Sequence, residues 1–138
     1  MAATTERIVE IKGERPPAVA DLLAANQTIY AGSVAMQDAG KIKKYAPGVA
    51  GHAILGLTRQ TLISAGVDVS FPQGEKPTFG RGCMQMKILG GAPVTQAHIG
   101  KKVRLEDEDT VSANAIGAND ASFYLRAIED GMAWVDVE

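Results

Sequence analysis

The sequence predicts a single all-β domain, a small β-barrel or jelly-roll-like sandwich with little helix. About eight short runs of strand-like composition follow one another at roughly ten-residue spacing, with turn residues between them. The 15 glycines among 138 residues exceed the ~7% of an average protein, as expected for a chain with many turns. No segment sustains a helical repeat, so we expect about seven or more strands and less than ~15% helix. Residues 1–138 fit one domain, since domains commonly hold ~100–150 residues.

The chain opens with a small, polar stretch, residues 1–6, for which we expect a flexible arm. A first strand is predicted over residues 7–11. Gly13 and the pair Pro16-Pro17 should end it, because proline has no backbone N–H to donate. Residues 18–25 favour helix but are too few for an isolated one, so they predict either one or two helical turns or an apolar loop.

A β-hairpin is predicted at residues 28–45. Its first strand, residues 28–36, contains Gly32, which indicates a bulge or the close approach of another backbone. Residues 38–40, Asp-Ala-Gly, supply the turn, and residues 41–45 form the return strand.

Three further runs follow a turn at Pro47-Gly48. The apolar residues 52–58 predict a buried strand. Residues 61–64 either continue that strand or pair with it, and residues 67–71 predict another short strand.

Residues 83–89 show the clearest alternation in the chain and predict a half-buried strand. Residues 90–93, Gly-Gly-Ala-Pro, should end it. The predicted inward face consists of Met84, Met86 and Ile88, and the outward face of Gln85 and Lys87.

The C-terminal third combines one helical turn with several strands. Thr95 is expected to cap a turn over residues 96–99. Strands are predicted at residues 102–105 and 110–112, and the acidic run 106–109 between them lacks the spacing of a calcium loop, so we expect a solvated turn.

The last predicted hairpin pairs residues 122–128 with residues 132–137 around an Asp-Gly turn. Trp134 points to the opposite side from Val135, so we expect the Trp134 face to be covered rather than bare.

Charge and composition narrow the function classes. The formal net charge is −2, with 14 basic and 16 acidic residues well mixed, so the chain has no basic stripe for nucleic acid. No apolar run approaches the ~18 residues of a membrane span, and the N-terminus carries no export signal. We therefore expect a soluble, unexported protein that folds in a reducing cytoplasm and binds neither nucleic acid nor membranes.

Candidate chemistry is sparse. His52 and His98 have no carboxylate at a ligand spacing, and Cys83 excludes an intrachain disulfide because it has no second cysteine to pair with. We expect structural roles for all three. The glycines in residues 80–82 and 90–91 lack the context of a phosphate loop, so we interpret both as turns. The sequence predicts no catalytic residue, no metal site and no cofactor.

Residues 64–69, SAGVDV, resemble the first motif of trimeric dUTP pyrophosphatases. In that family Asp68 would help to hold the metal and the pyrophosphate. The other motifs of the family do not follow: its arginine-serine-glycine turn, its substrate hairpin and its glycine-rich closing segment are missing. A nucleotide hydrolase therefore ranks as the third alternative.

Two segments together resemble small tailed-phage proteins encoded near the major capsid gene. Residues 28–40, TIYAGSVAMQDAG, resemble a hairpin in which a threonine, an aromatic residue, Ala-Gly, an apolar strand and a turn follow one another. Residues 97–113, AHIGKKVRLEDEDTVSA, resemble a later segment with Ile-Gly-Lys, a strand, an acidic turn and Thr-Val. Residues 131–135, GMAWV, are similar to the terminal strand of that group. Residues 61–86 show no clear match.

Those phage proteins are capsid decoration, or cement, proteins. The resemblance therefore implies a β-barrel or jelly-roll domain on the outer capsid surface of a virion, with the major capsid protein as its partner. Each copy would bridge capsid subunits, and many modest contacts would add up. We expect the protein to associate with itself, a homodimer being favoured and a trimer possible. Another phage structural component, a head-completion or tail protein, is the alternative.

Aromatic residues outside the core would anchor such an interface. The candidates are Tyr30, Tyr45, Phe71 and Trp134, and the alternative for each is that it packs in the core. The polar N-terminal residues 1–7 are expected to supply an extra contact by ordering on a neighbour.

We expect Met86→Asp to lower the free energy of unfolding by several kcal/mol, because it places an unpaired charge on the inward face of its strand. Lys87→Asp, on the outward face, is expected to cost little. The melting temperatures of the two variants test the assigned faces, and equal losses would contradict them.

Overall fold

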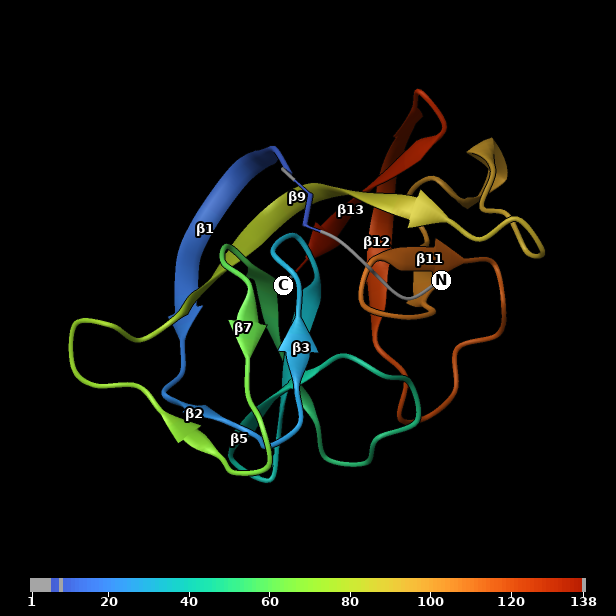
Figure 1. Ribbon diagram of the computed structural model, residues 1–138. Coiled ribbons are helices and arrows are strands. Elements are labelled where there is room, and N and C mark those ends of the chain that lie inside the picture. The colour runs from blue at the N-terminus through green and yellow to red at the C-terminus, as the bar shows by residue number, and fades with distance from the viewer. Residues whose placement is uncertain (1–5, 8, 138) are drawn as a thin grey trace.

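The computed structural model describes residues 6, 7 and 9–137 and confirms the predicted all-β class. Strands account for 49% of the protein, and the described residues include one helical turn, the 3-10 helix η1 (Gln96–His98), capped at Thr95 as predicted. Figure 1 shows how the strands are arranged. They are β1 (Ile11–Val19), β2 (Leu22–Leu23), β3 (Thr28–Ile29), β4 (Val34–Asp38), β5 (Lys41–Lys44), β6 (Ala53–Thr58), β7 (Leu62–Ile63), β8 (Val69–Ser70), β9 (Thr78–Ile88), β10 (Lys102–Leu105), β11 (Thr110–Ser112), β12 (Ser122–Glu129) and β13 (Met132–Val137).

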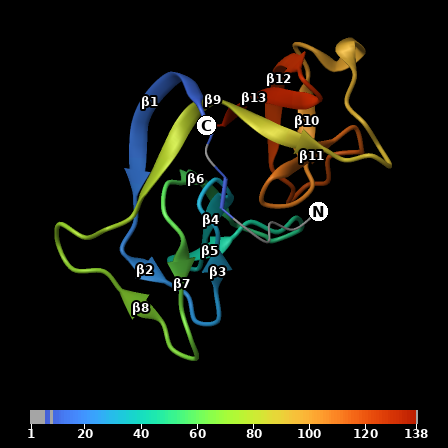
Figure 2. The same cartoon turned by 45° about the horizontal axis from the view of Figure 1, so that its top comes forward.

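Five strands close into a β-barrel, seen on the right of Figure 2. Their order is β11, β10, β12, β13 and β9, and a parallel pairing of β9 with β11 closes the ring. We call the cluster that fills it the barrel core. Its members on these strands are Met84, Met86, Val103, Leu105, Val111, Phe123, Leu125, Ala133, Val135 and Val137.

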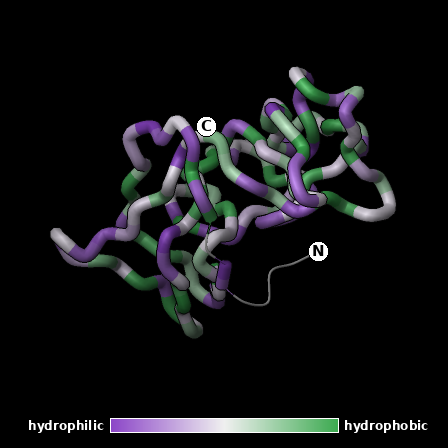
Figure 3. Tube along the Cα trace, turned by 90° about the horizontal axis from the view of Figure 1, so that it is seen from above, coloured by the Kyte–Doolittle hydropathy of each residue, from purple (hydrophilic) through white to green (hydrophobic). Residues whose placement is uncertain are grey.

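The remaining strands build a sandwich-like region beside the barrel. The sheet continues from β9 through β6, β4, β5 and β2 to β8, and the two-stranded sheet β3–β7 packs over it at the front of Figure 1. Figure 3 shows hydrophobic segments in both regions of the molecule. We call the apolar cluster between the two sheets the sandwich core. Its members are Leu23, Ile29, Ala35, Ile42, Leu55, Leu62 and Phe79.

Strand β4 separates the two cores. Val34 and Met36 belong to the barrel core, whereas Ala35 between them belongs to the sandwich core. All three are buried, because apolar groups cover both faces of the strand. A strand covered on both faces has a continuous apolar run in place of polar alternation.

Strand β9 is the longest, with 11 residues, and it has neighbours along both edges. Strands β1 and β11 pair along one edge, and β6 and β13 pair along the other. A Cβ added at Gly80 would lie 2.6 Å from Cδ1 of Ile11, and one added at Gly82 would lie 2.8 Å from Cγ2 of Ile11. The turn predicted at residues 80–82 is wrong, because these residues lie inside β9. Their glycines allow β1 to pack closely against β9.

Strand β1 continues through the residues that we expected to end it. It begins at Ile11, not at residue 7, and runs through Gly13 and the pair Pro16-Pro17 to Val19. Among the strands that the structure describes, it pairs only with β9, and two register shifts let the ladder skip Gly13 and both prolines. Proline is tolerated at such irregular edge positions because no partner needs its missing N–H.

Residues 18–25 contain no helical turn, so that alternative is wrong. Strand β2 in this segment pairs in parallel with β5 and antiparallel with β8. Leu23 is fully buried in the sandwich core. Burial of this side chain outweighs the local helix propensity of the segment.

The two tight hairpins predicted from their turn residues are confirmed. Strands β4 and β5 pair around Ala39 and Gly40, whose φ angles are 53° and 79°. Strands β12 and β13 pair around Asp130 and Gly131, with φ angles of 53° and 73°. Two successive left-handed residues match the twist of a two-residue hairpin loop.

The predicted strand at residues 28–36 is interrupted at Gly32, which separates β3 from β4. A Cβ added at Gly32 would lie 2.7 Å from the carbonyl oxygen of Arg7, which confirms the predicted close approach of another backbone. Residues 62–63 form the separate strand β7, which pairs with β3 and not with the preceding β6, so both alternatives for residues 61–64 are wrong.

The alternation predicted at residues 83–89 is confirmed, since Met84 and Met86 are fully buried. The structure changes the expectation for Lys87→Asp, which we now expect to be costly although Lys87 faces outward. Nζ of Lys87 lies 2.9 Å from Oδ2 of Asp109, and the Asp109 side chain is 0% exposed. An aspartate at position 87 would bring a second carboxylate close to a buried one.

We expect Gly82→Ala to lower the free energy of unfolding by about 2 kcal/mol or more. The φ of Gly82 is +138°, and an added Cβ would lie 2.8 Å from Ile11 Cγ2. Gly90→Ala is the matched control, because nothing lies within 4 Å of a Cβ there, and its effect should stay within about 0.5 kcal/mol. Urea unfolding measures both variants. Equal losses would show that β1 does not pack closely on β9.

Candidate functional site

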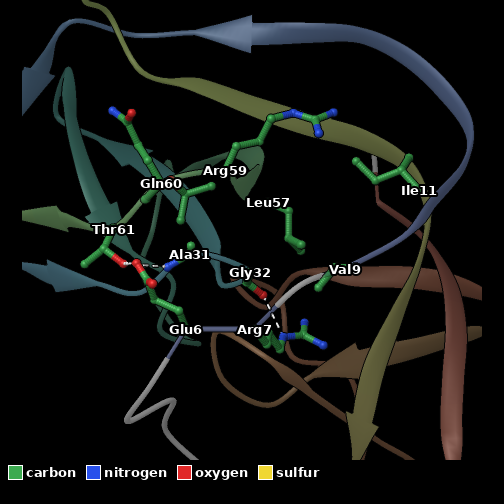
Figure 4. Close-up of a pocket in the computed structure, with 11 residues that line it drawn as sticks. Glu6, Arg7, Val9, Ile11, Ala31, Gly32, Leu57, Arg59, Gln60 and Thr61 are labelled. Atoms are coloured by element: carbon green, nitrogen blue, oxygen red, sulfur yellow. Dashed lines mark hydrogen bonds between the residues drawn. The ribbon is translucent and has the colours of Figure 1, made fainter.

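An open pocket of about 710 Å³ lies beside the N-terminal segment. Figure 4 shows that its lining comes from residues 6, 7, 9 and 11, from the turn between β3 and β4, and from the end of β6 with the residues that follow. The apolar lining includes Val9, Ile11 and Leu57, and the polar lining includes Glu6, Arg59, Gln60 and Thr61.

Thr61 joins two sides of this pocket. Its hydroxyl donates a hydrogen bond to the carboxylate of Glu6 and accepts one from the backbone amide of Ala31 at 3.1 Å. Glu6 is exposed, so its carboxylate also faces solvent. Residues 1–5 of the expected N-terminal arm lie outside the residues that the structure describes.

Arg59 lies on the opposite side of the pocket in Figure 4. Its Nη2 is 2.6 Å from Oε2 of Glu14, and the two side chains are 44% and 51% exposed. Such an exposed ion pair contributes little to stability, so either partner can turn towards a ligand. The lining residues described by the structure include no histidine, cysteine or lysine, and Glu6 is their one carboxylate. The arrangement can hydrogen-bond a polar ligand through the exposed side chains of Glu6, Arg59 and Gln60.

Arg7 fastens the N-terminal segment to both parts of the molecule. Its Nε donates a hydrogen bond to the carbonyl of Gly32 at 2.8 Å, and its Nη1 donates one to the carbonyl of Gln85 at 2.9 Å. Burial lowers the pKa of Arg7, and the negative charge of Asp109 opposes that shift. The guanidinium is therefore engaged within the protein, although we expected residues 1–7 to contact a neighbour.

The acidic run at residues 106–109 is not the solvated turn that we expected. Glu108 and Asp109 are 1% and 0% exposed. Besides its pairing with Lys87, Asp109 accepts a hydrogen bond from the hydroxyl of Thr110 at 2.9 Å. Burial acts to raise the pKa of Asp109, but hydrogen bonds led by that from Lys87 outweigh it, and the pKa is lowered. The local composition of the run gave no sign of these partners.

Arg104 organises the base of the exposed loop between β11 and β12. Its Nε donates a hydrogen bond to Asp120 at 2.9 Å, and its Nη1 donates one to Glu106 at 2.7 Å. Glu106 also accepts hydrogen bonds from Ser112 at 2.6 Å and from Asn114 at 2.7 Å. These hydrogen bonds, led by that from Ser112, lower the pKa of Glu106.

The four aromatic residues predicted to anchor an interface occupy different environments. Tyr45 and Trp134 are 1% and 4% exposed, so both belong to the interior and offer almost no surface to a partner. Nζ of Lys12 lies 4.0 Å from the centre of the Trp134 ring, which confirms that this face of the last hairpin is covered. Tyr30 and Phe71 are half-buried and keep part of their surface.

The histidines and the cysteine have structural surroundings. Nδ1 of His52 lies 2.7 Å from the carbonyl oxygen of Val49. Nδ1 of His98 accepts a hydrogen bond from the amide of Thr95 at 2.9 Å, within the capping box of η1. Burial raises the pKa of Cys83, which disfavours the reactive thiolate.

The segment that resembles a dUTP pyrophosphatase motif uses its carboxylate to hold neighbouring strands. Asp68 pairs with Nζ of Lys41 at 2.8 Å and accepts a hydrogen bond from the amide of Ala25 at 2.9 Å. The hydrogen bond from Lys41, followed by that from Ala25, lowers the pKa of Asp68. Across the described ranges, no group of three or more potential metal ligands occurs.

Sequence reasoning missed one exposed aromatic site. Tyr124 on β12 is 37% exposed. Nζ of Lys102 lies 5.4 Å and Cζ of Arg126 5.1 Å from the centre of its ring. Tyr124 and Arg126 alternate with the buried residues Phe123 and Leu125, so their outward positions could have been read from the strand period.

Comparisons with known proteins identified no similar protein, so the function is inferred from the sequence and from the geometry described above. A scan of protein-family models matched no family, and searches of the curated proteins and of the solved structures found no match. In the part of the chain that the structure describes, no helix combines the length and apolar character that crossing a membrane requires.

We expect Lys87→Met to lower the free energy of unfolding by about 1–3 kcal/mol at neutral pH, because it removes the ammonium partner of buried Asp109. The Lys87 side chain is 42% exposed, so screening keeps the loss below that of a fully buried pair. The folded pKa of Asp109 is lowered, so the pair stabilises fully above the ordinary aspartate pKa of about 4. That contribution is lost as the pH falls below this value.

Lys76→Met is the control for Lys87→Met, since its partner Asp21 has a side chain that is 58% exposed. Its cost should stay within about 0.5 kcal/mol. Urea unfolding at neutral and acid pH measures both variants. A Lys87→Met deficit that did not shrink in acid would contradict the electrostatic role of the pair.

Proposed function

We propose that this protein is a structural virion protein that binds the outside of an assembled tailed-phage capsid. There it would stabilise the shell by bridging major capsid protein subunits. The observation that carries the proposal is the resemblance of residues 28–40 and 97–113 to capsid decoration proteins.

The structure supports reading these two segments together. Residues 28–40 form β3, β4 and the turn after it, and residues 97–113 include β10 and β11. The amide of Val34 donates a hydrogen bond to the carbonyl of Glu108 at 2.6 Å. The two sequence patterns therefore meet in one structural unit, where the sandwich joins the barrel.

The surface has features that suit binding to another protein through many contacts over a broad surface. The loop between β11 and β12 is exposed over residues 113–119, yet Arg104 and its carboxylate partners hold its base. Loops that are already ordered lose little conformational entropy on binding. The pocket adds exposed hydrogen-bonding groups at Glu6, Arg59 and Gln60.

Stabilisation of the shell follows from linkage. A ligand that binds the assembled lattice and not the separated subunits shifts the equilibrium towards the lattice. When one copy spans neighbouring subunits, modest individual contacts give high avidity, and free subunits cannot supply that geometry. A head-completion or tail protein would differ in copy number, which mass spectrometry of purified particles measures.

We expect the purified protein to bind undecorated mature heads saturably and to raise their resistance to heat, while binding unassembled capsid subunits far more weakly. Co-sedimentation gives the occupancy, and DNA release during heating gives the resistance. Equal affinity for free subunits would contradict bridging of the lattice. Binding to neither form would remove the proposal.

A further inference from the structure

The outer face of the barrel carries a tyrosine between two cations. Tyr124 projects from β12 and is 37% exposed, with Lys102 Nζ 5.4 Å and Arg126 Cζ 5.1 Å from its ring centre. Lys102 lies directly across from Tyr124 in the β10–β12 ladder. Two cations thus flank one accessible aromatic ring.

The nearest carboxylate on the adjoining strand is already paired. Asp136 on β13 lies 2.9 Å from Arg126 and 3.4 Å from Arg15, so one negative charge is shared by two guanidinium groups. This face therefore has an excess of positive charge, although the whole chain carries a net charge of −2. A positively charged face of this kind is complementary to an acidic surface on a partner protein.

We propose that this face, defined by Lys102, Tyr124 and Arg126, docks on an acidic protein surface of the capsid shell. The inference rests on the proposed function and specifies the face that it uses. Tyrosine and arginine are the side chains that most often dominate interface energies. Here two paired strands hold them, so little ordering is needed on binding.

An acidic protein surface fits this face better than a nucleic acid does. Proteins that bind single strands stack successive bases on several aromatic side chains along a basic groove. In the described part of the chain, Tyr124 is the one exposed tyrosine, and the phenylalanines and the tryptophan are buried or half-buried. A single anchor surrounded by cations suits a compact group of carboxylates.

The test measures the affinity of variants for undecorated heads at low and high salt. Lys102→Glu and Tyr124→Ala should each weaken binding by roughly tenfold or more. Lys76→Glu makes the same charge change in the loop before β9, far along the sheet from this face, and should alter affinity by less than about threefold. The salt dependence of Lys102→Glu should be weaker than that of the wild type, because fewer ion pairs form.

Each outcome is informative. If Lys102→Glu misfolds, as judged by its melting temperature, Arg126→Glu provides the same charge reversal at the other cation beside the Tyr124 ring. Wild-type binding that neither variant weakens would overturn the docking face and leave the proposed function standing. No binding by the wild type would overturn both. Competition by oligothymidylate that depends on Tyr124 would assign the face to nucleic acid and overturn the inference.

Discussion

The fold depends on the close packing of neighbouring strands along both edges of β9. Such packing leaves no room for side chains where neighbouring strands approach most closely, and glycines occupy those positions. A Cβ at Gly80 or Gly82 would collide with Ile11 of β1, and one at Gly56 on β6 would lie 2.5 Å from the carbonyl oxygen of Gly80. At Gly56 and Gly82 the nearest atoms include backbone carbonyl oxygens, which cannot move aside as a side chain can, so these two glycines permit the close approach of β6 and β1 to β9.

This shared strand makes the two cores mutually dependent. Phe79 at the start of β9 packs in the sandwich core, whereas Met84 and Met86 pack in the barrel core. Unfolding either region would remove a neighbour that the other needs, so the molecule should unfold as one cooperative unit. Arg7 strengthens this dependence, since its guanidinium bonds to the carbonyls of Gly32 in one region and Gln85 in the other.

Local turn chemistry predicted much of this fold, and contacts between distant residues account for the errors. The hairpin turns ending at Gly40 and Gly131 could be predicted because their geometry is set by adjacent residues. Strand β2 and the burial of Asp109 could not, because Leu23 is buried by strands later in the chain and Lys87 lies 22 positions before its partner in the numbering. The pocket was equally hidden, since its lining comes from three separate segments.

The same contrast explains why the candidate interface was only partly predictable. Aromatic character alone does not distinguish a core residue from an anchor, and Tyr45 and Trp134 proved to be core residues. Strand period identifies Tyr124, which alternates with buried neighbours while cations flank it. It does not identify Trp134 as a core residue, because Trp134 also alternates with buried neighbours and is covered by Lys12 from β1. A protein that acts by repeated contact needs no reactive group, only a rigid face of suitable charge. The paired strands β10 and β12 supply that rigidity at low entropic cost, and the lattice of its partner would supply the repetition.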